Sequence, residues 1–440
     1  MSAVPALRPS RRRLLRWAAG SGLAAFAGAF GSRLRLARSH PGRLRFAHTY
    51  TTESERAVLG QVTAEFESAH PGLRIEHSAL NSEVYNSVGW RLQFQGRHQP
   101  DLYFHWQGFK VDQCIRRGWA MDLGPRLSPG FRRQFVPAAL REQRGGLYFL
   151  PQSIDLCNLV WYNRDLFDRL GLSEPRTFGE WLEICRRVRS AGWLPLAQGN
   201  RDLWPMGNFA AELAGQSVGP EAFGRFFEPG TGLPADVPRA LVRLAELRDA
   251  GAFDLDGVLS PGAIGEMSDI DAKVLFLGGR SAMHLLGSWF LADILDARAK
   301  GGLKFEVGLF SVPPAEGETD ALAGVTTGFL MHPRGANLPA GVEFLELFLS
   351  RKYQAEFARM GALSGRSDAA EFTLDPLARR MLGILGAGTP VVPPPDTGFP
   401  PDQANVFYEV VARLLTRRLE PATAPAYWAE EKRQLARKGL

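Results

Sequence analysis

Short strand-like segments alternate with helical segments at the start of the folded region, and this order limits the possible folds most strongly. Val58, Val62 and Phe66 recur at four-residue spacing, which predicts an amphipathic helix that ends before Pro71. The order strand, helix, strand, helix, strand predicts an α/β domain with a parallel sheet, because parallel neighbours are joined by helical crossovers. The three predicted strands are 44–50, 73–77 and 100–106, and the second predicted helix is about 82–96.

The remaining pattern also mixes strands and helices. A strand over 156–162 is followed by a helix at Asn163, and a strand over 281–286 is followed by Gly287-Ser288-Trp289. Later segments predict a strand near 322–331 and amphipathic helices over 341–360 and 405–419. The chain has 440 residues. Because a single core rarely grows to that size, two domains are expected, with one large domain as the alternative.

The positive charge of the chain is concentrated at its N-terminus. The formal net charge is +6, and residues 1–38 contain eight arginines and no acidic residue, so residues 39–440 carry −2. An apolar run of 14 residues, Trp17 to Phe30, follows the first arginines. This run is too short for a membrane span and is typical of a signal peptide. Residues 1–38 are therefore predicted to be an export signal that is cleaved near Ala29 or Ala37.

The export route is indicated by Ser10-Arg11-Arg12-Arg13-Leu14-Leu15-Arg16, which resembles the twin-arginine motif of bacterial export cargo. A periplasmic location is expected. Without its leader the chain loses the basic excess that would favour nucleic acid, so no nucleic-acid partner is expected.

Cys114, Cys157 and Cys185 are too few and too scattered for a zinc or redox site, and the eight histidines are scattered as well. One disulfide could form among the three cysteines, and the sequence does not say which two would pair. No cofactor, no metal site and no catalytic residue are expected, because no paired carboxylates, G-x-S-x-G, H-E-x-x-H or phosphate-binding loop is present.

Several weak motifs, taken in their order and spacing, resemble one protein family. The chain resembles the extracellular solute-binding proteins of ABC importers, in the carbohydrate-binding group that includes maltodextrin-binding proteins. The loop Gly361-Ala362-Leu363-Ser364-Gly365 departs from that pattern, which usually has Leu-Pro there. The matching segments are Thr49 to Glu53, Glu65 to Gly72, Pro100 to Phe104, Tyr148 to Pro151, Trp161 to Phe167, Pro175 to Trp181, Gly279 to Met283, Gly287 to Trp289 and the helix after Pro339.

The resemblance implies a two-lobed periplasmic-binding-protein fold of type II, with the ligand in a cleft between the lobes. Lobe one would comprise 40–155 plus 323–365, and lobe two 156–322 plus 366–440. Ligand clefts are common at domain interfaces, and closure couples binding to a change of shape. The implied partners are a small carbohydrate ligand and an ABC permease in the inner membrane, and the protein is expected to be a monomer.

A sugar site needs aromatic rings that stack on the sugar and polar groups that bind its hydroxyls. Loops and strand ends that would face the cleft supply the candidates, although a core, capping or surface role is the alternative for each. Trp289 is the first candidate for stacking, and either His105 or Trp106 is expected to face the ligand. The candidate ligand-binding residues are Thr52, Glu53, Asn81, His105, Trp106, Asp155, Trp204, Trp289 and Arg366.

Other functions remain possible from the sequence. Arg366 and Arg201 leave open a receptor for a polyol or a glycerophosphodiester, because phosphate favours convergent arginines. A periplasmic sensor input is a further alternative. A secreted glycosidase is less favoured, because it would need two carboxylates at a fixed separation. The identity of the sugar does not follow from the sequence.

Overall fold

The computed structural model describes residues 42–96, 99–226, 237–255, 259–260, 262–335 and 337–437. The chain divides into Met1–Arg38 and Ser39–Leu440, and every described residue belongs to the second unit. The predicted export signal, residues 1–38, therefore lies outside the described residues.

The predicted parallel strands form one half of the first sheet. β1 (Arg43–His48) pairs in parallel with β2 (Arg74–Ala79) and with β3 (Leu102–Trp106). Helix α1 (Glu53–Ala69) connects β1 to β2 and buries Val58, Leu59, Val62 and Phe66. This confirms the predicted apolar stripe of the first helix and the α/β order.

The second predicted helix is interrupted. It consists of α2 (Ser82–Val84), a π-helical turn η1 (Tyr85–Gly89) and α3 (Trp90–Gln95). A Cβ atom at Gly89 would lie 2.7 Å from a Leu80 methyl carbon and 2.9 Å from the Val84 carbonyl oxygen, so only glycine fits there. A π-turn inside a helix is rare and often lies at a functional site.

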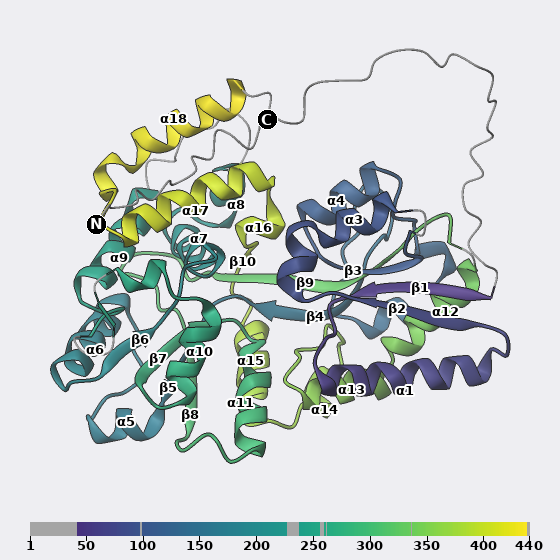
Figure 1. Cartoon of the computed structure of the whole chain (residues 1–440), viewed down its shortest axis with the longest axis horizontal. Coiled ribbons are helices and arrows are strands. Elements are labelled where there is room, and N and C mark those ends of the chain that lie inside the picture. Colours follow the sequence, from purple (N-terminus) through teal and green to yellow (C-terminus); the bar gives the residue numbers. More distant parts are fainter. Residues whose placement is uncertain are drawn as a thin grey trace, which may run out of the picture. The chain divides into compact units, whose positions relative to one another are not determined.

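Two long strands leave the first sheet and continue toward a second core. β9 (Leu322–Met331) pairs antiparallel with β3 and with β4 (Leu150–Leu156), and a short strand β10 (Val391–Val392) pairs with the start of β9. Leu150 and Met331 pack in one core, whereas Leu156 and Leu322 pack in another. Figure 1 shows β4 and β9 side by side between the two halves of the fold.

The second sheet has the order β6-β7-β5-β8. β6 runs parallel to β7, and β5 pairs antiparallel with β7 and β8. Helices cover this sheet and complete the core. The strands are β5 (Leu159–Asn163), β6 (Leu194–Ala197), β7 (Ser281–Leu286) and β8 (Val307–Ser311), and the helices are α5 (Arg164–Arg169), α6 (Phe178–Ser190), α7 (Trp204–Val218), α8 (Pro220–Phe226), α9 (Val237–Asp249), α10 (Asp269–Leu277) and α11 (Phe290–Ala299).

We call the half around β1, β2 and β3 lobe one and the half around the second sheet lobe two. The helix predicted over 341–360 is in fact two helices, because Ser350 has an extended backbone (ψ 155°) that ends one helix before the next begins. The remaining helices are α4 (Phe109–Arg116), α12 (Leu338–Phe348), α13 (Arg351–Arg359), α14 (Ala369–Phe372), α15 (Pro376–Gly386), α16 (Pro395–Gly398), α17 (Pro401–Leu415) and α18 (Ala424–Arg437), with short 3₁₀ turns at Gly124–Arg126, Phe131–Gln134, Ala263–Gly265 and Pro421–Thr423.

A third segment, which includes Leu363 to Gly365, runs between the lobes beside β4. The Ile154 N–H donates to the Leu363 carbonyl oxygen (2.8 Å), and the Gly365 N–H donates to the Gln152 carbonyl oxygen (3.3 Å). The loop that departs from the family pattern therefore lies along the free edge of β4. The boundaries of the two lobes, 40–155 plus 323–365 and 156–322 plus 366–440, stay a prediction.

Candidate ligand site between the lobes

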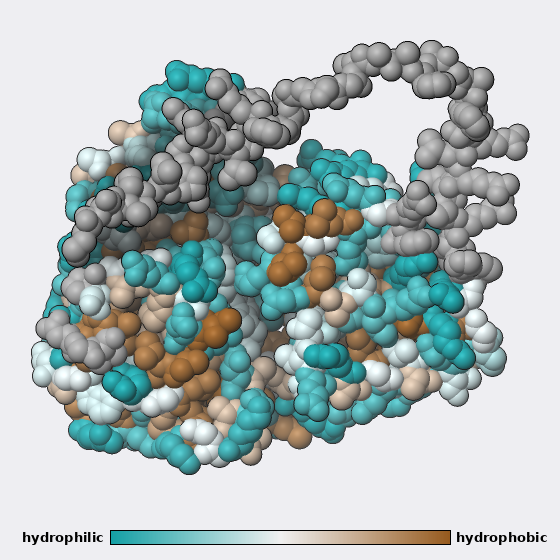
Figure 2. Space-filling model, in the orientation of Figure 1, coloured by the Kyte–Doolittle hydropathy of each residue, from teal (hydrophilic) through white to brown (hydrophobic). Residues whose placement is uncertain are grey.

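Three tryptophans lie at the boundary between the lobes. Trp106 ends β3 and packs against the cores of both lobes. Trp204 begins α7, and Trp289 directly precedes α11; their ring centroids are 6.0 Å apart at an angle of 53°. All three side chains are half-buried. Figure 2 shows the surface hollowed along the boundary between the lobes.

Local backbone geometry places the two lobe-two tryptophans. Leu203 has a positive φ of 67°, an unfavourable conformation for a bulky residue, and it turns the chain into α7 at Trp204. A Cβ atom at Gly287 would lie 2.2 Å from the Trp289 ring, so only glycine lets this ring fold back over the chain. The indole nitrogen of Trp204 is buried and has no hydrogen-bond partner among the described residues.

Asp155 of β4 lies next to the aromatic group. The Ser153 hydroxyl donates to its Oδ1 at 3.4 Å, and Ser288, the neighbour of Trp289, accepts a hydrogen bond from the Leu156 N–H at 3.2 Å. Burial raises the pKa of the Asp155 carboxyl to about 7. The structure thus places Trp204, Trp289 and Asp155 close together, and Trp106 of lobe one lies at the same boundary, packed against the cores of both lobes. By exposed area Asp155 is half-buried.

His105 lies in the core of lobe one, in contrast to its neighbour Trp106. Its side chain is fully buried, its ring centroid is 4.8 Å from that of Trp90, and neither ring nitrogen has a hydrogen-bond partner among the described residues. Burial lowers the pKa of His105 well below its usual range. His105 is therefore not part of the group at the lobe boundary in this structure.

Three predicted residues of lobe one are exposed at helix starts. Thr52 caps α1: its hydroxyl accepts from the Glu55 N–H at 3.3 Å, and Glu55 accepts in return from the Thr52 N–H at 3.0 Å. Glu53 lies in the first turn of the same helix. Asn81 caps α2 by accepting from the Glu83 N–H at 2.9 Å. The capping alternative accounts for the positions of Thr52 and Asn81.

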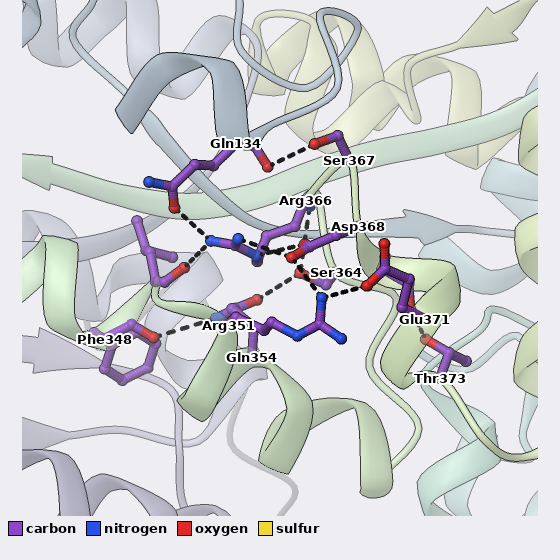
Figure 3. Close-up of polar contacts among 12 residues, drawn as sticks. Gln134, Phe348, Arg351, Gln354, Ser364, Arg366, Ser367, Asp368, Glu371 and Thr373 are labelled. Atoms are coloured by element: carbon purple, nitrogen blue, oxygen red, sulfur yellow. Dashed lines mark hydrogen bonds and ion pairs between the residues drawn. The ribbon is translucent and has the colours of Figure 1, made fainter. Parts of the chain in front are cut away.

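Arg366 is enclosed by other protein groups. Its guanidinium group donates to both carboxylate oxygens of Asp368 (2.7 and 3.0 Å), to the Gln134 side chain (2.8 Å) and to the Leu349 carbonyl oxygen (3.2 Å). The residue is 7% exposed. Figure 3 shows this guanidinium group between Gln134 and Asp368, with Arg351 nearby. These contacts hold the third crossing segment on lobe one and leave Arg366 no evident way to reach a ligand.

Polar residues that the sequence did not single out connect the lobes. The Asn86 amide donates to Asp396 (3.2 Å), and the ammonium group of Lys110, which lies 5.2 Å from the Trp106 ring centroid, donates to Asn86. Glu83 keeps exposed surface, yet shielding from water and then the negative charge of Asp269 raise its pKa to about 7. Partners so far apart in sequence give no local pattern that would have identified them.

The described residues offer neither a metal site nor a membrane-crossing helix. They contain no group of three or more His, Cys, Asp or Glu side chains that could hold a metal ion. The three cysteines are buried and unpaired. Among the helices that the structure describes, none is long and apolar enough to span a bilayer.

Known proteins match this chain in architecture and, at low identity, in sequence. The sequence model of the bacterial extracellular solute-binding proteins matches residues 50–355. A probable sugar-binding periplasmic protein of Mesorhizobium japonicum is 22% identical over 306 residues, which are 64% of this chain and 67% of the relative.

Two solved structures have the same two-lobed fold. A chitin oligosaccharide binding protein aligns with a TM-score of 0.75 and 21% identity, covering 91% of this chain and all of the other. The maltose/maltodextrin-binding domain of Bdellovibrio bacteriovorus, bound to maltotriose, aligns with a TM-score of 0.69 and 19% identity over 90% of this chain and all of that domain. From the match over residues 50–355 and the shared fold, the chain belongs to the family of bacterial extracellular solute-binding proteins.

Proposed function

We propose that this protein is an exported receptor that binds a sugar or oligosaccharide between its lobes and delivers it to the permease of an ABC importer. The observation that carries the proposal is the pair of Trp204 and Trp289 in lobe two beside Asp155, with Trp106 of lobe one at the same lobe boundary. Aromatic faces stack on the apolar face of a sugar ring, and a carboxylate accepts hydrogen bonds from its hydroxyls. The names of the relatives, sugar-binding and oligosaccharide-binding, support the same ligand class.

A phosphate-bearing ligand has less support. The guanidinium group of Arg366 already binds Asp368 and Gln134, and Arg201 is exposed with carboxylates of Asp202 and Asp271 about it (4.0 and 3.9 Å). Arg366 is enclosed by its own partners, and the two acidic neighbours of Arg201 disfavour an anion there, so the two do not form a convergent phosphate site. A polyol remains compatible with the aromatic group.

In this proposal the protein binds its ligand and catalyses no reaction. Ligand binding favours a closed arrangement of the lobes, and the permease responds to that arrangement. The protein works as a periplasmic monomer. Residues 1–38 direct export through the twin-arginine route, so replacing Arg11 and Arg12 together with lysine should leave uncleaved precursor in the cytoplasm.

For the lobe boundaries, which remain a prediction, we place the third crossing later than residue 366. Arg366 binds lobe-one groups, Ala369 and Phe372 pack on Ala358 of α13, and Leu377 packs in the core of lobe two. The crossing into lobe two would then fall at 373–375.

A thermal-shift screen tests the ligand class. The mature protein is heated with sugars, oligosaccharides, polyols and glycerophosphodiesters, and a ligand at 100 times its Kd stabilises the folded state by about 2.7 kcal/mol. We expect at least one sugar to raise the melting temperature. Stabilisation by phosphodiesters alone would contradict the proposal.

A further inference from the structure

Glu212 is a fully buried carboxylate in the middle of α7, inside the core of lobe two. Its exposed fraction is 0%, and Phe209, Ala210, Ala211 and Leu213 of the same helix are equally buried. No Lys or Arg of the described residues forms an ion pair with it, and its Oε1 atom is buried without a hydrogen-bond partner. A buried carboxylate is costly unless it is bound or neutralised, so its contacts require a reason.

The other oxygen of Glu212 binds two crossing segments at once. Its Oε2 atom accepts from the Asn158 side-chain amide at 2.9 Å and from the Ala323 N–H at 2.8 Å. Asn158 follows the lobe-two end of β4, and Ala323 is the second residue of β9. The two segments are themselves joined there, because the Cys157 N–H donates to the Ala323 carbonyl oxygen at 2.8 Å.

The neighbouring turns of α7 repeat this pattern. Asn208 and Gln216, four residues before and after Glu212, also hold the crossing segments or the chain that leads into them. The Asn208 carbonyl oxygen accepts from Asn158 (3.1 Å), and the Gln216 amide donates to the Ala321 carbonyl oxygen (3.3 Å). The helix therefore holds the crossings through the side chains of Glu212 and Gln216 and the main chain of Asn208, whereas the Asn208 side chain accepts from the Tyr408 hydroxyl (2.7 Å).

The same helix begins at the candidate ligand site. Trp204 is the first residue of α7, about two turns before Glu212. Because a helix moves as a rigid element, a ligand that shifts Trp204 also moves the oxygen that holds both crossing segments. A buried polar group that would be cheaper to replace by an apolar one is often kept to fix a unique arrangement.

We propose that Glu212 is a positioning residue for cleft closure: it anchors the lobe-two ends of β4 and β9 on α7 and so fixes the arrangement of the lobes that the ligand selects. The inference rests on the proposed function for the link to ligand, but the anchoring itself is a property of the ligand-free protein. Burial raises the pKa of Glu212 to about 8, which keeps the group neutral at pH 7. The charged or titratable groups around it are Arg243 of α9, Asp320 before β9 and Cys157 after β4.

The test measures lobe arrangement without ligand. Spin labels on Val88→Cys in lobe one and Val274→Cys in lobe two, 51% and 66% exposed, report the distance between the lobes, while the native cysteines are buried. In this background Glu212→Leu removes the anchor, and Glu212→Gln keeps an oxygen that accepts both hydrogen bonds. Hydrogen exchange at the Ala323 amide reports the anchor directly.

We expect Glu212→Leu to broaden the distance distribution and to speed exchange at Ala323 at least tenfold, while Glu212→Gln resembles the wild type. The control Val188→Ala, in the α6 core of lobe two, should lower the melting temperature and change neither readout. If Glu212→Leu does not fold, Asn158→Ala removes one of the two donors and should broaden the distances in the same direction.

Unchanged distances and exchange in both Glu212→Leu and Asn158→Ala would overturn the inference and leave Glu212 a core residue only. Because no ligand is added, this outcome is independent of the sugar screen. A failed sugar screen together with loosened lobes in Glu212→Leu would refute the proposed ligand class while the anchoring role stands.

Discussion

Replacing Glu212 with glutamine should change how the stability of the protein depends on pH. Burial raises the pKa of this carboxyl from its ordinary value of 4.5 to about 8 in the folded protein. The folded state therefore binds the proton more tightly than the unfolded state between these values. It follows that the contribution of Glu212 to stability falls as pH rises from about 4.5 to about 8 and is constant above that.

The size of the effect follows from the two pKa values. Each pH unit between them lowers the free energy of unfolding by about 1.4 kcal/mol, so the whole interval amounts to about 5 kcal/mol. Glutamine has nearly the shape of the neutral carboxyl group and does not titrate. It should keep the hydrogen bonds from Asn158 and Ala323 and remove this part of the pH dependence.

The assay is urea unfolding of the wild type and of Glu212→Gln at a series of pH values from 4.5 to 9. Asp155 and Glu83 also titrate near pH 7, but they contribute equally to both proteins. The difference between the two curves therefore isolates Glu212. We expect the free energy of unfolding of the variant, relative to that of the wild type, to rise by about 5 kcal/mol from pH 4.5 to pH 8. Above pH 8 the two free-energy curves should be parallel. Curves that are parallel throughout would refute the reasoning.

Three further predictions concern other buried groups. Arg366→Leu should cost about 1–3 kcal/mol of unfolding free energy, because it leaves the Gln134 side chain and the Leu349 carbonyl oxygen without their donor, whereas Arg351→Leu, at an exposed ion pair, should cost less than about 1 kcal/mol. Equal losses measured by urea unfolding would contradict this. Asp155 accepts hydrogen bonds best when ionised, so affinity for sugar should fall as pH drops below about 7, and Asp155→Asn should abolish that dependence in titration calorimetry. All three cysteines are buried, so a thiol reagent should modify them only after unfolding, and reaction in the native protein would show that their surroundings open.

The early part of the fold could be predicted because it depends on local pattern. The stripe of Val58, Val62 and Phe66 is confirmed as the buried face of α1, and the alternation of strands and helices is confirmed in the first sheet. Helix boundaries that depend on the backbone angles of a single residue were harder to predict. Periodicity continues through Ser350, whose extended conformation divides the helix predicted over 341–360.

The candidate site was only partly accessible from the sequence. Trp204, Trp289 and Asp155 lie close together, and Trp106 lies at the same boundary, because strand ends and helix starts meet there. Alternation along β3 does not distinguish His105 from Trp106, since Leu102 to Phe104 are buried whichever way they point.

Partners that are distant in sequence determine the roles of Arg366 and Glu212. Arg366 looks like a solvent-facing arginine until Gln134, 232 residues away, is placed beside it. Glu212 was missed, although a signal was present: Asn208, Glu212 and Gln216 recur every four residues in an otherwise apolar helix. Such a polar stripe indicates a buried face that binds backbone or side-chain groups.

The most direct test of the account is titration calorimetry of the mature protein with a sugar that stabilises it in the thermal screen. Trp289→Ala removes a ring at the lobe boundary, and the control Trp193→Ala removes another half-buried tryptophan of lobe two that lies just before β6, outside the tryptophan group. We predict saturable one-to-one binding that is lost in Trp289→Ala and kept in Trp193→Ala, with nearly unchanged melting temperature of the ligand-free Trp289→Ala protein. Sugar binding that survives Trp289→Ala, or no binding of any sugar by the wild type, would contradict the account.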